Sequence, residues 1–130
     1  MSGSEPCAQV VLQRVRNQII GLLETFSSYD EQREYAQNVP VAYVPYELLN
    51  SWDDFVDESW PAQFTDPVFT EEERRAIAVF NAQLVAVSEA MPDTYPRLEE
   101  VLAAPYWIAL REAAVKALLS FRQRGRLAED

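Results

Sequence analysis

The stretch TEEERRAIAVFNAQLVAVSEAM, residues 70–91, decides the fold class of this chain. Thr70 and Glu73 have the spacing of a capping box, in which each side chain satisfies a backbone amide of the other residue at the start of a helix. Apolar residues then recur at every third or fourth position and form one stripe: Ile77, Phe80, Leu84, Val87 and Met91. Pro92 ends the pattern, because proline cannot continue a helix interior. The stretch therefore predicts a long amphipathic helix.

Outward from this helix, the other segments repeat a helical apolar period between prolines, which mark segment boundaries. Two more long helices are expected, one running from about Val11 to Phe26 and one opened by Pro105 and ended by Gly125. A helix opened by Pro45 is expected at Tyr46–Glu58, and shorter helical pieces are indicated at residues 30–38 and 94–102. Residues 59–69 are aromatic-rich and are expected to form a loop. The sequence thus predicts an all-α fold, with residues 1–130 as a single compact domain, a helical bundle of four to five helices.

The last helix carries apolar residues on two sides. One face contains Trp107, Leu110, Ala114, Ala117, Leu118 and Phe121, and a second face contains Ile108, Val115 and Leu119. The favoured interpretation is a central helix that is packed on both sides. The alternative is that the second face forms a homodimer contact or a partner interface.

Composition excludes several classes of protein. The 130 residues carry a net charge of −10, which argues against direct binding to nucleic acid. The chain has no histidine and one cysteine, Cys7, which excludes histidine-based catalysis, cysteine zinc sites and an internal disulfide. Neither a signal peptide nor a stretch long enough to span a membrane is visible, so we expect a cytoplasmic protein that does not act at membranes. Ten arginines against one lysine are typical of a GC-rich bacterial source.

The net charge is concentrated in one part of the chain. Between Glu34 and Glu73 lie ten acidic residues and no lysine or arginine, whereas the remainder holds eleven acidic and eleven basic residues. Within this part, the helix expected at Tyr46–Glu58 places apolar residues on one side and five carboxylates on the other. Such a face is either a solvated surface or a surface for a cation or a basic partner.

Aromatic residues accompany these carboxylates, and tyrosine and tryptophan next to carboxylates suit the recognition of arginine-rich surfaces. We therefore expect a non-enzymatic binding module, without a cofactor, that captures a basic protein such as a toxin. In physical type it is similar to small bacterial immunity proteins that neutralise nucleases, or to inhibitors, with nucleic-acid mimicry as a variant. The expected partner-binding residues are Tyr46, Glu47, Asp53, Asp54, Asp57, Glu58 and Trp60.

An enzymatic alternative rests on two pairs of acidic residues. Glu31 and Glu34 are spaced ExxE, and Asp54 and Asp57 are spaced DxxD. This arrangement resembles the all-α nucleoside triphosphate pyrophosphohydrolases, and the resemblance implies a Mg²⁺ site formed by these four carboxylates. Such an enzyme also needs cations to hold phosphates, so Arg33, Arg74 or Arg75 would have to fold back to the carboxylates.

Overall fold

Seven α-helices account for most of residues 7–130, the part of the chain that the computed structural model describes. In order they are α1 (Ala8–Ser27), α2 (Tyr29–Asn38), α3 (Val44–Phe55), α4 (Trp60–Gln63), α5 (Glu71–Ala90), α6 (Leu98–Ala103) and α7 (Pro105–Arg122). No strand occurs among these residues, so the all-α prediction is confirmed. The predicted count of four to five helices is wrong, because α2 and α6 are separate short helices and residues 59–69, expected to be a loop, contain the short helix α4.

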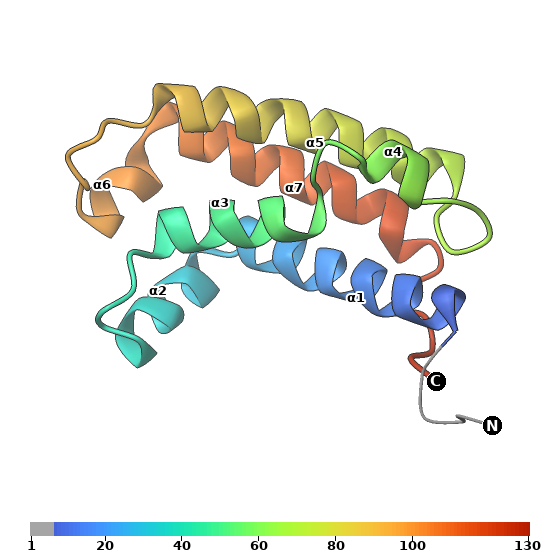
Figure 1. The fold of residues 1–130 in the computed structure, drawn as a ribbon. Helices are drawn as coiled ribbons and strands as arrows, with labels where there is room; N and C mark the ends of the chain where they lie inside the picture. The colour runs from blue at the N-terminus through green and yellow to red at the C-terminus, as the bar shows by residue number, and fades with distance from the viewer. Residues whose placement is uncertain (1–6) are drawn as a thin grey trace.

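The four long helices pack around one apolar core (Figure 1). Helix α7 packs against both α5 and α1, and α3 packs against α1. Each long helix contributes one large ring to a chain of aromatic contacts through the core. Phe26 of α1 lies 5.2 Å from Phe80 of α5 and 6.2 Å from Trp107 of α7, and Trp52 of α3 lies 4.6 Å from Phe80 between ring centroids. These contacts join helices that are distant in sequence.

The start of α5 confirms the capping box. The Thr70 hydroxyl accepts a hydrogen bond from the Glu73 amide, and the Glu73 carboxylate accepts one from the Thr70 amide, both at 3.1 Å. The predicted stripe is buried, from Ile77 at one end to Met91 at the other. Local sequence and tertiary packing therefore agree along the whole helix.

Helix α3 starts and ends earlier than the predicted Tyr46–Glu58. It begins at Val44, with Pro45 in its first turn, where a missing amide hydrogen costs nothing. It ends at Phe55, and the next residues turn away, because the Asp57 carboxylate accepts hydrogen bonds from the amide and the hydroxyl of Ser59. A side chain that binds a nearby backbone amide in this way competes with the helix.

The second apolar face of α7 is not buried by the other described residues. Ile108 is half-buried, whereas Val115 is 46 % exposed and Leu119 is 63 % exposed. The prediction that α7 is packed on both apolar faces is therefore wrong. Helices α5 and α1 flank the first face, and no described helix covers the second.

The chain reverses direction after α7 and returns along α1. Gly125 adopts a left-handed φ of 70°, which glycine tolerates, and its amide donates to the carbonyl of Phe121 at 2.9 Å. Asn17 then pairs with the backbone of Leu127, donating to its carbonyl at 2.8 Å and accepting from its amide at 2.9 Å. Arg126 is paired with Glu24. The segment after α7 is thus fastened along the side of α1.

Candidate binding surface

The carboxylates of α3 face solvent because the opposite side of the helix is anchored in the core. The Trp52 ring is buried, and its indole N–H donates to the Asn81 side chain of α5 at 2.9 Å. This bond fixes the rotation of α3 about its axis. Leu48, Leu49 and Trp52 point inward, and Asp53 and Asp54 are exposed, as the helical pattern predicts.

The turn after α3 continues the acidic surface. Asp57 and Glu58 are exposed, and Trp60 is half-buried with its ring 5.8 Å from that of Phe64. The two hydrogen bonds from Ser59 hold the pKa of the Asp57 carboxyl below its ordinary value, because they favour the ionised form. We call Asp53, Asp54, Asp57, Glu58 and Trp60 the α3 surface.

The carboxylates of the α3 surface have no counter-ion within residues 7–130. Among the described residues, no ion pair involves Asp53, Asp54, Asp57 or Glu58. Partial burial, and next the nearby Asp54 charge, raise the pKa of the Asp53 carboxyl above its ordinary value. The surface therefore holds negative charge that the fold leaves uncompensated.

Two grooves flank the C-terminal end of α3. The first has a volume of about 670 Å³ and lies between α3, the start of α1 and the connection before α5; we call it the α1–α3 groove. Its walls are Ala8, Gln9, Val11, Leu12, Val15, Asp54, Phe55, Asp57, Gln63, Phe64, Thr65, Asp66, Pro67 and Val68. The second, of about 530 Å³, lies on the α5 side and includes Asp53, Asp57, Glu58 and Trp60. Within the described chain, neither groove is lined by lysine or arginine.

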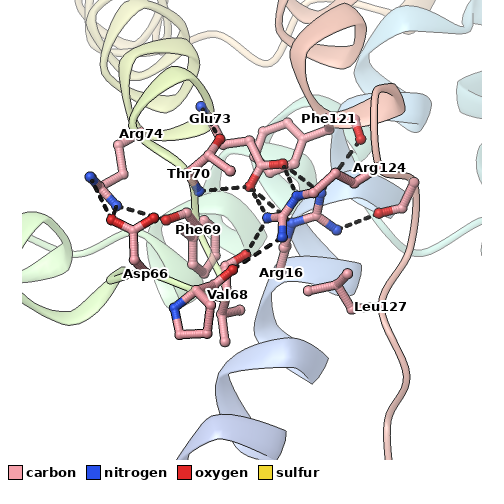
Figure 2. Close-up of polar contacts among 12 residues, drawn as sticks. Arg16, Asp66, Val68, Phe69, Thr70, Glu73, Arg74, Phe121, Arg124 and Leu127 are labelled. Carbon is pink, nitrogen blue, oxygen red and sulfur yellow. Dashed lines mark hydrogen bonds and ion pairs between the residues drawn. The ribbon is translucent and has the colours of Figure 1, made fainter.

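A buried ion network fixes one wall of the α1–α3 groove (Figure 2). Arg16 of α1 donates to both carboxylate oxygens of Glu73, at 3.1 and 2.7 Å, and Arg124 donates to the same oxygens at 3.1 and 2.6 Å. The remaining hydrogens of Arg124 bind the carbonyls of Pro67 at 3.1 Å and Val68 at 2.6 Å. Because Pro67 and Val68 line the groove, the network sets the position of that wall.

The charge state of Glu73 is stabilised by this network. Burial alone raises the pKa of a carboxyl, but the hydrogen bonds from Arg16, Arg124 and the Thr70 amide outweigh that effect. The pKa of Glu73 therefore lies below its ordinary value, and the carboxylate stays ionised at neutral pH. Two arginines share one buried carboxylate, so the network keeps a net positive charge that the backbone carbonyls partly solvate.

Tyr46 and Glu47, also expected to bind the partner, lie at the other end of α3. Glu47 is exposed in the first turn. The Tyr46 ring lies 4.8 Å from that of Tyr43 and 5.2 Å from that of Tyr95, and its hydroxyl donates to the Pro92 carbonyl at 3.2 Å. Tyr46 thus joins the start of α3 to the turn after α5, apart from the α3 surface.

The enzymatic alternative assigns Mg²⁺ to four carboxylates that the structure places in two separate parts of the chain. In residues 7–130, no group of three or more acidic or cysteine side chains is arranged to hold a metal ion. Glu31 and Glu34 lie on α2, whereas Asp54 and Asp57 lie at the far end of α3. The arginines that the resemblance requires are engaged elsewhere: Arg33 with Glu99, Arg74 with Asp66, and Arg75 with Glu71. The described residues therefore do not bring the four carboxylates and these arginines together.

Sequence reasoning missed the α1–α3 groove. Leu12 and Val15 continue the apolar stripe of α1, but they are only half-buried and line the groove. The other wall comes from residues 63–68, which have no periodic pattern. The available signal was Val11, an apolar residue next to the stripe, which the structure leaves 46 % exposed.

None of the helices in residues 7–130 combines the length and the apolar character that a membrane crossing requires. Comparison with known proteins found no matching family model, no matching curated protein and no matching solved structure.

Proposed function

We propose that this chain is a non-enzymatic binding module that captures a basic protein through the α3 surface. It would act as immunity proteins and inhibitors do, by covering a cationic site on its partner. In the nucleic-acid-mimicking variant of this proposal, the covered site is one at which the partner binds DNA or RNA. The compartment that we propose is the cytoplasm.

One observation carries the proposal: four carboxylates gather at the C-terminal end of α3 and in the turn after it, with no ion-pair partner among the described residues. Seven arginines are held in ion pairs with carboxylates of the chain, whereas Asp53, Asp54, Asp57 and Glu58 have no such partner among the described residues. Like charges that are close together destabilise the compact state. Their position at the end of α3 and in the turn after it, next to a half-buried tryptophan, suits a surface that binds arginine and lysine.

The test compares two variants that each lose four negative charges. In the first, Asp53, Asp54, Asp57 and Glu58 are replaced by their amides. In the control, the amides replace Glu31, Glu34, Glu89 and Asp93, which are exposed and outside any ion pair of the described chain. The protein captured from the source lysate by the unmodified chain is then used to measure association rates across a salt series.

We expect the α3 variant to associate more slowly than the control, with the largest difference at low salt. The reason is that the screening length falls from about 30 Å at 0.01 M to about 3 Å at 1 M ionic strength. An α3 variant that associates as fast as the wild type at low salt would overturn the proposal. Equal slowing in both variants would show that only net charge matters. Competition by an added oligonucleotide for the partner would identify the nucleic-acid-mimicking form.

A further inference from the structure

The α1–α3 groove combines apolar walls with an acidic edge. Its apolar walls come from three segments: Val11, Leu12 and Val15 on α1, Phe55 on α3, and the connection that includes Val68. Val11 is 46 % exposed, so a substantial apolar area at the groove remains in contact with water. Burial of this area by a ligand would be favourable.

The edge of the groove selects the charge of that ligand. Asp54, Asp57 and Asp66 line it, each from a different segment, and only Asp66 has an ion-pair partner among the described residues, Arg74 at 3.3 Å. An anionic ligand would meet carboxylates on several sides and no cation that lines the groove. A single small cation would neutralise one carboxylate and leave the others. The separate positions of the three carboxylates favour a ligand with several cations along its length.

The groove is also held in shape before any ligand binds. Arg124 binds the carbonyls of Pro67 and Val68, and Arg74 binds the Phe69 carbonyl at 2.7 Å together with Asp66 (Figure 2). The C-terminal part of the connection that forms this wall, residues 66–69, is therefore held by two arginines. A preformed site binds more tightly, because less ordering is required on association.

We propose that the α1–α3 groove binds an amphipathic basic segment of the partner, with an aliphatic side chain in the groove and arginine or lysine against Asp54 and Asp57. This inference rests on the proposed function and adds the place at which the partner is anchored. It assigns a role to α1 and to residues 63–68 in addition to the α3 surface.

The probe for this site is a synthetic helical peptide that carries leucine on one side and arginine on the other. The full chain, labelled with ¹⁵N, is titrated with this peptide. We expect backbone shift changes at Val11, Leu12 and Val15 and in residues 63–68. A control peptide with serine in place of each leucine keeps the charge and should bind more weakly by about tenfold, the loss typical of one buried apolar side chain.

Two charge-neutral variants then test the groove itself. Val11→Trp fills the groove, whereas Val79→Trp makes the same substitution at a residue that is 66 % exposed on α5 and lines neither groove. Both positions are exposed enough for the chain to fold with either tryptophan. We expect Val11→Trp to weaken binding of the leucine–arginine peptide by about tenfold and Val79→Trp to leave it unchanged.

The outcomes separate this inference from the proposed function. Shift changes confined to the groove on the α5 side, or unchanged peptide binding by Val11→Trp, would overturn the inference about the α1–α3 groove. Neither result would contradict the proposal that the α3 surface captures a basic protein. Loss of partner capture in the amide variant is the separate test of that function. If the wild type sediments as a dimer and Val11→Trp as a monomer, a second copy of the chain covers the groove and the inference is wrong.

Discussion

Arg16 and Glu73 form a two-pronged ion pair in which the side chains are 0 % and 1 % exposed. The residues are 57 positions apart in the sequence, on α1 and α5. The same Glu73 carboxylate serves the capping box of α5 and, through Arg124, the wall of the α1–α3 groove. One side chain thus links the start of a helix, the packing of α1 and the candidate binding site.

Removal of the Glu73 charge should destabilise the protein strongly. In Glu73→Gln, two arginines remain near the core without their carboxylate, and such a loss typically costs about 3–5 kcal/mol. The matched control is Glu71→Gln in the same helical turn, where the ion pair with Arg75 is exposed and is worth at most about 1 kcal/mol. Urea denaturation of both variants measures the difference. Equal effects would show that the buried network contributes no more than an exposed pair.

The effect of Glu73→Gln should depend on pH with a definite sign. The folded-state pKa of Glu73 is lowered from its ordinary value of 4.5, so its stabilising contribution is complete above that value and is lost as the pH falls through the folded-state pKa. The difference in unfolding free energy between wild type and variant should therefore be largest near neutral pH and shrink in acid. Denaturation at a series of pH values measures it, and a constant difference would contradict the pKa shift.

The ionised Asp53 carboxylate should affect folding stability with the opposite sign to that of Glu73. Its folded-state pKa is raised above 3.8, so the ionised carboxylate opposes folding, fully so above the folded-state pKa and not at all well below 3.8. Asp53→Asn should leave stability at neutral pH unchanged or raise it by at most about 0.5 kcal/mol, because the side chain is exposed. The gain should vanish in acid. A clear loss of stability at neutral pH would show that this carboxylate has a structural role.

Two tyrosines give a matched test of hydrogen bonding. The Tyr29 hydroxyl is buried and has no hydrogen-bond partner among the described residues, whereas the Tyr43 hydroxyl donates to the Pro96 carbonyl at 2.7 Å. Tyr29→Phe should leave stability unchanged or raise it by up to about 1 kcal/mol, since an unsatisfied group is removed. Tyr43→Phe should lower it by about 1 kcal/mol. Thermal and chemical denaturation of both variants check which of the two is more stable.

The exposed face of α7 can be tested at two adjacent residues. Val115→Glu should keep the unfolding free energy within about 0.5 kcal/mol, because Val115 faces solvent. Ala114→Glu should destabilise by more than about 4 kcal/mol, because Ala114 is buried and the new charge would have no partner. Sedimentation of the folded Val115→Glu variant then tests the alternative that this face forms a homodimer contact: a wild-type dimer that becomes a monomer identifies α7 as the interface. A wild type that is already a monomer would contradict it.

Local signals predicted the helices well where pattern and capping agreed. The α5 start at Thr70 and the inward-facing residues of α3 followed from spacing alone, because a helix fixes which residues share a face. The C-terminal boundary of α3 could not be predicted in this way. The hydrogen bonds from Ser59 to the Asp57 carboxylate, which form the turn after α3, leave no trace in the apolar periodicity.

The groove and the ion network depend on which helices meet, and this was not readable from the sequence. Arg16 lies within the apolar stripe of α1, but nothing local relates it to Glu73 or to Arg124. In the same way, the exposure of Val115 depends on which face of α7 packs against α5 and α1, and the α7 sequence alone does not determine that face. Long-range packing decides such positions, and one sequence contains no direct record of it.

The contacts of Arg16 have a consequence for synthesis of the protein. Its guanidinium binds the Glu73 carboxylate and the carbonyls of Phe121 and Gly125, and Asn17 next to it binds Leu127. A ribosome releases α1 long before it releases residues 121–127, and a charged arginine cannot be buried without its partners. During translation α1 therefore cannot complete its packing until nearly the whole of the described chain has emerged. Until then, the apolar stripe of α1 remains uncovered on the side that later contacts α7.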